Sequence, residues 1–322
     1  RKISLFCNVE PEHVIQSIDV KSIYEVPIKY NEEKLDKKIL NIFGIKEKNK
    51  ANLKVWKDIV SKINSKRKKI SIAIVGKYVD LKDAYKSLDE ALIHGSINND
   101  VDLNTEWVDS TKINKNNVNK ILKNYSAILI PGGFGSRGTE GKIEAIAYAR
   151  KYKVPFFGIC FGMQMAVIES ARNMLGIKKA TSSEFGNGGS HVVGLMSEWI
   201  KGKTVQKGSK KNLGGTMRLG SYKAKLKKNS LISKIYKSTV INERHRHRYE
   251  VNKNLKSRLE KKGLIFSGLS PDGSLPETIE LENHPWFIGV QFHPEFKSRP
   301  FAPHPLFSSF IKAAKDNSKK ND

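Results

Sequence analysis

The run Gly158-Ile159-Cys160-Phe161-Gly162 constrains this chain most, because it joins a strand to a helix with no loop between them. Residues 154–159 form a short apolar segment that is typical of a buried strand, and residues 161–173 follow at once with a pattern that favours a helix. So tight a turn strains the backbone at its apex, and flanking glycines let the strand and the helix approach closely. The spacing predicts a strand–nucleophile–helix elbow centred on Cys160.

The rest of the chain repeats the alternation of strand and helix. Apolar segments typical of strands lie at 70–75, 101–108, 127–130 and 154–159, with later strands at 222–226 and 287–292. Segments that favour helices lie at 83–94, 141–152 and 161–173. Alternation of this kind indicates an α/β fold, with an open, mostly parallel sheet flanked by helices.

The chain is predicted to have four parts. Residues 1–45, with a strand at Ile3–Phe6, are too few to bury a core. Residues 46–68 are charged, with apolar residues at helical spacing, and are expected to form a linker helix. The α/β domain covers 69–315 and contains a Gly-, Ser-, Lys- and Asn-rich loop or hairpin at 186–215, whose Lys-rich part, 200–212, has no assigned role. Residues 316–322 are a polar tail.

Composition excludes several classes of protein. The two cysteines, Cys7 and Cys160, rule out a disulfide scaffold and favour a reducing compartment such as the cytoplasm, with Cys7 expected to be a structural thiol. No Cys/His cluster has the spacing of zinc ligands, no apolar run is long enough to span a bilayer, and no signal peptide is recognisable. The net charge of +26 is spread along the chain without a nucleic-acid motif, which argues against nucleic acid as a partner. Because the chain begins with Arg1, we expect a fragment or a processed form.

Two further motifs give the elbow a chemical context. At the start of a helix, the helix dipole favours the thiolate of Cys160, although a buried structural cysteine fits the same turn. His293 and Glu295 follow an apolar strand in Phe292-His-Pro-Glu-Phe296, where His293 is placed to take the thiol proton and Glu295 to orient the ring. Pro131-Gly-Gly-Phe-Gly135 offers backbone N–H groups to an oxyanion; the alternatives are a plain turn or a phosphate loop.

Three motifs together resemble the class I glutamine amidotransferases, which have a flavodoxin-like glutaminase fold. They are PGGFG at 131–135, GICFGMQ at 158–164 and FHPEF at 292–296. Within these enzymes the chain is most similar to the CTP synthase family, through 76–95, GGTMRLG at 214–220, ERHRHRYEVN at 243–252 and NHPWFIGVQFHPEF at 283–296. RKISLFCNV at 1–9 and DVKSIYEVPI at 19–28 resemble the end of that family's synthetase (amidoligase) domain.

The resemblance implies Cys160, His293 and Glu295 as a catalytic triad, with the N–H groups of Gly133 and Phe161 as the oxyanion hole. Glutamine is a zwitterion, so its ammonium needs acceptors and its carboxylate needs donors. Residue chemistry alone offers Glu184 and Gln164 for the first need, and Arg244, Arg246 or Arg248 for the second; the three arginines also fit a solvated edge strand or an anion site. The resemblance selects Arg248 and implies the further glutamine contacts Gly133, Phe161, Gly162, Met163, Gln164 and Glu184.

The resemblance also implies the place of this chain in a larger enzyme. In CTP synthases (a ligase activity, EC 6.3.4.2), ammonia passes to a synthetase domain that uses ATP and Mg²⁺ to convert UTP to CTP, and GTP stimulates the glutaminase. The P-loop part of that domain is lacking here, so no cofactor is expected on this chain, and the full enzyme is expected to be a homotetramer. Alternatives are another Cys-His-Glu hydrolase of γ-glutamyl substrates, a regulatory or assembly module, and a basic nucleic-acid binder.

Overall fold

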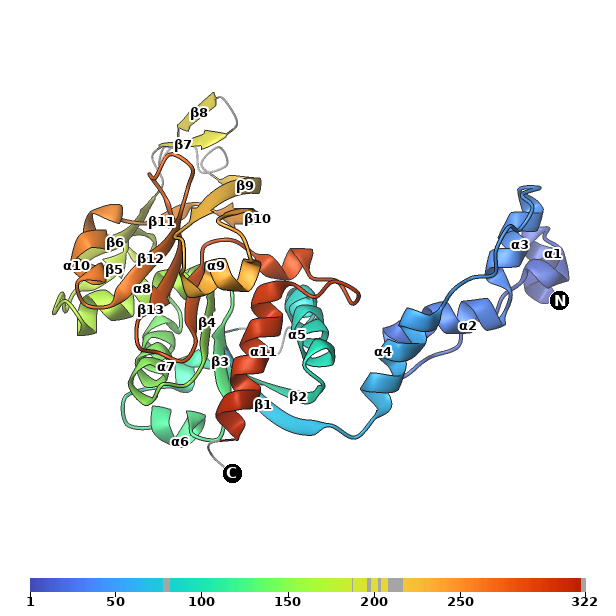
Figure 1. Cartoon of the computed structure of the whole chain (residues 1–322), viewed down its shortest axis with the longest axis horizontal. Helices are drawn as coiled ribbons and strands as arrows, with labels where there is room; N and C mark the ends of the chain where they lie inside the picture. Colours follow the sequence, from blue (N-terminus) through green and yellow to red (C-terminus); the bar gives the residue numbers. More distant parts are fainter. Residues whose placement is uncertain (78–81, 187, 196–197, 202–203, 208–216, 320–322) are drawn as a thin grey trace. The chain divides into compact units, whose positions relative to one another are not determined.

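The structure, a computed structural model, divides the chain into two compact units, Arg1–Arg67 and Lys68–Asp322 (Figure 1). It describes residues 1–77, 82–186, 188–195, 198–201, 204–207 and 217–319. The boundary at Arg67/Lys68 lies one residue before the predicted start of the α/β domain at 69. The two units are described separately.

The first unit consists of short helices: α1 (Lys2–Cys7), α2 (Val26–Glu32), α3 (Leu35–Ile42) and α4 (Lys54–Asn64), with 3₁₀ turns at Pro11–His13 and Ile23–Glu25. The predicted strand at Ile3–Phe6 is wrong, because these residues lie in α1. A strand this short needs a partner strand for its backbone hydrogen bonds, whereas a helix forms them within itself. Cys7 is exposed, so the expectation of a structural thiol is also wrong.

Helix α4 lies within the predicted linker segment 46–68. Ile59 is its buried residue, and Trp56 of α4 lies with its ring centroid 6.5 Å from that of Tyr24, which is buried. The apolar positions at helical spacing therefore pack within the first unit.

A nine-stranded sheet forms the centre of the second unit, in the order β10-β9-β12-β13-β14-β4-β3-β1-β2 (Figure 1). Five neighbouring strands are parallel: β2 (Val101–Asp109), β1 (Lys68–Gly76), β3 (Ala127–Ile130), β4 (Phe156–Ile159) and β14 (Phe287–Val290). This β2-β1-β3-β4-β14 order is the 2-1-3-4-5 order of flavodoxin-like sheets. The predicted α/β class and open sheet are confirmed.

The sheet continues beyond β14 with antiparallel strands: β13 (Pro276–Leu281), β12 (Leu264–Leu269), β9 (Arg218–Leu226) and β10 (Val240–His247). Strand β10 is at the edge. Its side chains alternate, so that Arg244 and Arg246 are exposed while His245 and His247 are buried. The edge-strand interpretation of the alternating arginines is therefore correct for Arg244 and Arg246.

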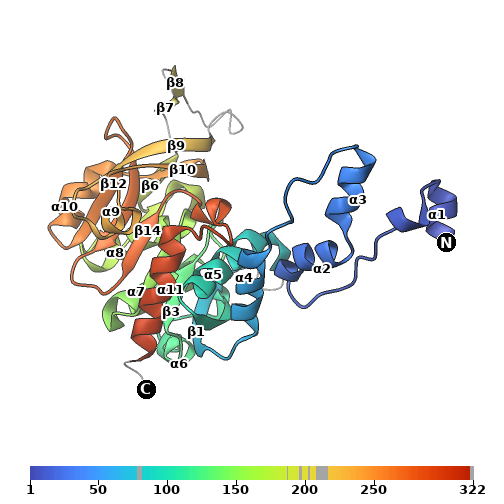
Figure 2. The same ribbon diagram turned by 45° about the vertical axis from the view of Figure 1, so that its right-hand side comes forward.

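Helices cover both faces of the parallel strands, and each face has its own apolar core. Helices α7 (Thr139–Tyr152) and α8 (Phe161–Asn173) pack together on one face. Helices α5 (Lys86–Asn98) and α11 (Pro305–Ser318) pack together on the other, as Figures 1 and 2 show. Shorter helices are α6 (Val118–Leu122), α9 (Leu231–Tyr236) and α10 (Lys256–Glu260).

A second sheet, β11-β6-β5, contains β11 (Tyr249–Val251), β6 (Ser190–Leu195) and β5 (Ala180–Ser182). Strands β7 (Glu198–Lys201) and β8 (Thr204–Lys207) pair as an antiparallel hairpin, as expected for part of segment 186–215. The rest of the Lys-rich segment 200–212 lies outside the described residues, as do 214–216 of GGTMRLG. Helix α11 extends to Ser318 and so includes the first three residues of the predicted tail; residues 320–322 are not described.

Candidate active site

Three neighbouring strands, β3, β4 and β14, end at the same edge of the sheet, and each is followed by one of the three motifs. PGGFG follows β3, Cys160 follows β4, and Gln291-Phe292-His293 follows β14. Since parallel strands in the order β3-β4-β14 carry their carboxyl ends side by side, motifs far apart in sequence meet in space.

The elbow at Cys160 has the geometry that its glycines predict. Cys160 lies between β4 and α8 with φ 50° and ψ −99°, in the left-handed region that non-glycine residues rarely adopt. A Cβ on Gly162 would stand 2.2 Å from the carbonyl oxygen of Ile130, and one on Gly158 would stand 2.8 Å from the backbone of Gly162. Both contacts are too close for any side chain, so the crossing of strand and helix requires glycine at 158 and at 162.

Cys160 is 5% exposed and lies at the N-terminus of α8. Its backbone N–H donates to the carbonyl of Val290 at 2.6 Å, which fixes the elbow to the end of β14. A helix N-terminus stabilises an anion, so this placement favours the thiolate.

His293 and Glu295 form a close pair beside the elbow. Nδ1 of His293 lies 2.7 Å from Oε1 of Glu295, and both side chains are largely buried. Burial on its own lowers the pKa of His293, but hydrogen bonds and charge from Cys160 and Glu295 outweigh it and raise the pKa well above its ordinary value. The raised pKa favours an imidazolium at position 293, beside the sulfur of Cys160 and the carboxylate of Glu295.

The glycine-rich loop at 131–135 packs closely against these groups. A Cβ on Gly132 would stand 2.7 Å from Cε1 of His293, and one on Gly133 would stand 4.0 Å from the ring of Phe161. The N–H of Gly135 donates to Oε1 of Glu184 at 2.7 Å. The loop is thus hydrogen-bonded to Glu184, and Gly133 lies next to Phe161, the residue that follows Cys160.

Phe161 has a charged neighbour that sequence reasoning missed. Nζ of Lys142, on α7, lies 5.5 Å from the centre of the Phe161 ring, and Lys142 is 3% exposed. Burial, reinforced by the charge of Lys77, lowers the pKa of Lys142 to about 8. Lys142 lies on helix α7, seven residues after PGGFG, and belongs to none of the sequence motifs. Its burial next to Phe161 could therefore not be predicted from the sequence.

Two of the candidate contacts for glutamine, Glu184 and Arg248, lie near Tyr249, another residue that the sequence did not single out. Glu184 and Arg248 both act electrostatically on its hydroxyl, the first raising and the second lowering its pKa, although burial is the larger cause and raises it. Glu184 itself has a raised pKa because it is buried, an effect that the Gly135 N–H and Lys77 oppose. Arg248 is half-buried, and its Nε has no hydrogen-bond partner among the described residues.

The side chains of Gln164 and Met163 are buried, so each has few groups left to contact a substrate. The amide nitrogen of Gln164 donates to the carbonyl of Tyr249 at 2.9 Å and to Oε1 of Gln291 at 3.2 Å, so its carbonyl oxygen is the group left to accept from a ligand. The Met163 side chain is fully buried in the core between α8 and the sheet. A contact between Met163 and a ligand would therefore have to come from its backbone.

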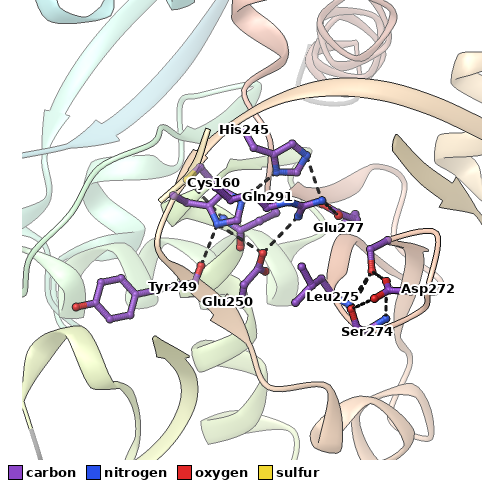
Figure 3. Close-up of polar contacts among 12 residues, drawn as sticks. Cys160, His245, Tyr249, Glu250, Asp272, Ser274, Leu275, Glu277 and Gln291 are labelled. Atoms are coloured by element: carbon purple, nitrogen blue, oxygen red, sulfur yellow. Dashed lines mark hydrogen bonds and ion pairs between the residues drawn. The ribbon is translucent and has the colours of Figure 1, made fainter. Parts of the chain in front are cut away.

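A buried network of charged and polar side chains includes His245, Glu250 and Glu277, which Figure 3 labels. Arg218 of β9 binds Glu277 of β13 at 2.6 Å and reaches Glu250 of β11 at 3.4 Å, and all three are buried. His245 lies 3.5 Å from Glu277 and donates to or accepts from His247 at 2.9 Å. Sequence reasoning missed this network because its members come from four strands, β9, β10, β11 and β13. Only its two histidines belong to a pattern that the sequence analysis noted, the alternation RHRHR.

A surface hollow of about 790 Å³ is lined by residues of α6, α7 and α8, and none of the strand-end residues belongs to it. Within the described ranges, no group of three or more His, Cys, Asp or Glu side chains is arranged to hold a metal ion. No helix in the described part of the chain combines the length and apolar character needed to cross a membrane.

Comparisons with known proteins agree with this geometry. Residues 80–313 match the family model described as glutamine amidotransferase class-I, and residues 1–45 match the model described as CTP synthase N-terminus. The chain is 64% identical over 317 residues to a protein named CTP synthase from Pelagibacter ubique, covering 98% of this chain and 59% of that protein. It is 58% identical over 320 residues to a protein of the same name from Rhizobium johnstonii, covering 99% of this chain and 59% of that protein.

One solved structure is similar over most of the chain. It is described as the Trypanosoma brucei CTPS glutaminase domain with bound acivicin, with a TM-score of 0.69 and 38% identity, covering 77% of this chain and 94% of that one. The chain spans about three fifths of the length of the curated relatives that it matches.

Proposed function

The chain belongs to the class I glutamine amidotransferases and contains the glutaminase domain of a CTP synthase, and on this premise we propose that Cys160, His293 and Glu295 are the residues that hydrolyse L-glutamine to glutamate and ammonia. The observation that carries the proposal is the meeting of the strained Cys160 elbow with the His293–Glu295 pair at the ends of β4 and β14.

The reaction that we propose has two stages. The Cys160 thiolate attacks the side-chain amide carbon of glutamine, and the oxyanion that forms accepts hydrogen bonds from the N–H groups of Gly133 and Phe161. The imidazolium of His293 then gives its proton to the departing ammonia, which leaves a γ-glutamyl thioester. In the second stage His293 takes a proton from water, the resulting hydroxide attacks the thioester, and glutamate leaves as the thiolate is restored. Glu295 keeps the imidazole ring of His293 oriented toward Cys160 in both stages.

Glutamine recognition is assigned to the groups around Tyr249. We propose that the α-carboxylate binds Arg248, whose buried Nε has no partner among the described residues. The α-ammonium is assigned to Glu184 and to the carbonyl oxygen of Gln164, and backbone groups of Gly162 and Met163 complete the pocket. Because a buried charge without a partner is unfavourable, an occupied site satisfies Arg248 better than an empty one.

The destination of the ammonia lies in the larger enzyme. Residues 1–45 match the CTP synthase N-terminus model, and a synthetase partner domain follows from the family. We propose that this domain binds ATP, UTP and Mg²⁺ and uses the ammonia to form CTP, with residues 1–45 as its end, 46–68 as the linker and 69–315 as the glutaminase. GTP as an activator, a homotetrameric enzyme and a cytoplasmic location belong to the same proposal.

A glutaminase assay tests the chemistry directly. The 322-residue chain and its Cys160→Ala variant are compared for release of glutamate, with and without GTP. A diazo-ketone analogue of glutamine is expected to label Cys160 and to leave the exposed Cys7 unlabelled. Equal rates in the two proteins, or labelling of Cys7 in place of Cys160, would remove the proposed mechanism.

A further inference from the structure

Gln291 is a buried amide directly beside Cys160, and the proposed mechanism gives it no role. It is fully buried, it follows β14, and it precedes His293 by two residues. Its Nε2 donates to Sγ of Cys160 at 3.5 Å (Figure 3). That length is ordinary for a hydrogen bond to sulfur, so two donors, His293 and Gln291, converge on the nucleophile.

The orientation of this amide is fixed by a backbone carbonyl. The carbonyl oxygen of Tyr249 only accepts hydrogen bonds, so the group of Gln164 that lies 2.9 Å away must be its nitrogen. The same nitrogen lies 3.2 Å from Gln291, which must therefore present its oxygen to Gln164. The nitrogen of Gln291 is left to face Sγ, and the reverse orientation would set donor against donor.

The Tyr249 carbonyl is itself held by the histidines of β10. Nδ1 of His247 lies 3.2 Å from that carbonyl, and Nε2 of His247 lies 2.9 Å from Nδ1 of His245. Burial and the charge of Arg218 lower the pKa of both histidines well below the ordinary value, so both rings are neutral. A neutral ring that donates from Nδ1 accepts at Nε2, so the hydrogen bonds run in one direction, from His245 through His247 to Tyr249.

An amide and an imidazolium differ as partners of a thiolate. The His293 proton is transferred in the proposed reaction, whereas a glutamine N–H does not titrate and keeps donating each time the thiolate is restored. A hydrogen bond to a charged acceptor is also stronger than one to a neutral acceptor, so the Gln291 N–H favours the thiolate over the thiol.

We propose that Gln291 is a positioning residue that stabilises the Cys160 thiolate and holds its sulfur toward the substrate, through the hydrogen-bonded series Tyr249 carbonyl–Gln164–Gln291–Sγ. This inference rests on the proposed function, because it assumes that Cys160 is the nucleophile. It adds a residue that the triad and the oxyanion hole leave unused.

The test uses the full chain with Cys7→Ser, so that Cys160 is its one thiol. The rate of alkylation by iodoacetamide is measured against pH, since only the thiolate reacts. Gln291→Met keeps the length of the side chain and removes the donor. The midpoint of the profile is expected to move upward by about one pH unit, which corresponds to the loss of one hydrogen bond to a charged group. For glutamine hydrolysis, kcat is expected to fall about tenfold, with KM changed less than twofold.

Three further variants separate the effect of the hydrogen bond from a general loss of stability. Gln164→Met releases the oxygen of Gln291 and is expected to raise the midpoint by a smaller amount. Ser267→Ala removes a buried hydrogen bond to Thr278 of 2.9 Å in the same sheet, and should lower the melting temperature without moving the midpoint. Gln291→Glu keeps the shape of the side chain, and its carboxylate is expected to move the midpoint upward at least as far as the Met variant does.

The possible results are distinct. If Gln291→Met and Gln291→Glu are folded and their midpoints match that of the parent, the inference is overturned. If Gln291→Met does not fold, Gln291→Glu and Gln164→Met decide the matter by the same measurement. If the parent alkylates normally but hydrolyses no glutamine, the proposed function fails while the pH profile still tests the role of Gln291.

Discussion

Gly132 lies against the imidazole of His293, so closely that a Cβ at position 132 would stand 2.7 Å from Cε1 of the ring. The backbone of Gly132 is not in the left-handed region, so its conformation does not require glycine. The requirement comes from the ring, which occupies the space where a side chain would lie. The glycine at position 132 of PGGFG is therefore required by His293, a residue about half the chain length further along the sequence.

The first prediction follows from this contact. Gly132→Ala should push the His293 ring out of line with Cys160 and lower kcat about 100-fold, since a displacement of about 1 Å costs that much. The melting temperature should change little, because His293 belongs to neither of the two apolar cores. Gly194→Ala is the control, as its Cβ would meet no atom closer than 4.0 Å. Full activity in Gly132→Ala would show that the ring has room to move.

The second prediction concerns the proton on His293. Burial opposes the imidazolium, and Cys160 and Glu295 together raise the pKa well above the ordinary value of 6.5. Glu295→Gln removes one of the two charges, so the pKa of His293 should fall. Titration of ¹⁵N-labelled histidine followed by NMR measures this. An unchanged pKa would mean that Glu295 orients the ring without stabilising its charge.

The same pKa fixes how stability depends on pH. A group whose pKa is higher in the folded state than in the unfolded state binds its proton more tightly when folded. The contribution of His293 is therefore fully present below pH 6.5 and is lost as pH rises through the folded pKa. The difference in unfolding free energy between the parent and His293→Gln should shrink across that range, and urea titrations at several pH values test it.

The third prediction concerns the pair Arg218–Glu277, whose side chains are 2% and 0% exposed. Arg218→Met leaves two buried carboxylates, Glu277 and Glu250, without their cation. The variant should lose about 3–5 kcal/mol of unfolding free energy, because an uncompensated buried charge is left behind. Burial raises the pKa of both carboxyls, and removing Arg218 raises it further, so the variant should regain stability as pH falls.

A double variant checks the origin of that loss. Arg218→Met with Glu277→Leu removes both members of the closer pair and should be more stable than Arg218→Met alone. Urea unfolding gives the free energies. If the double variant loses the sum of the two single losses, the pair does not interact and the prediction is wrong.

The fold and the local structure at the three motifs could be predicted from the sequence, for a physical reason. Each motif is local: the elbow needs its glycines within two residues of Cys160, and the His293–Glu295 pair spans two residues. Alternating strands and helices then leave few possible sheet orders, and the observed one sets β3, β4 and β14 side by side. The catalytic roles remain predictions until they are measured.

Other features depend on contacts that no local pattern records. Arg218 and Glu277 are 59 residues apart and look like surface residues in the sequence, and Gln291 is marked only by its place before FHPEF. The α1 error has the opposite cause, because a short apolar segment fits a strand or a helix and only its surroundings decide between them.

The last prediction separates Arg248 from its exposed neighbour Arg246, which sequence chemistry could not do. Arg248 is half-buried next to Tyr249, and its Nε lacks a partner among the described residues, whereas Arg246 is exposed on the edge strand. If Arg248 binds the carboxylate of glutamine, Arg248→Lys should raise KM for glutamine at least tenfold, because a single ammonium does not replace a two-point contact. Arg246→Lys should leave KM within twofold of the parent. Steady-state glutamine hydrolysis by the three proteins measures this, and equal increases in both variants would mean that the basic edge as a whole attracts the substrate and that Arg248 has no specific contact with it.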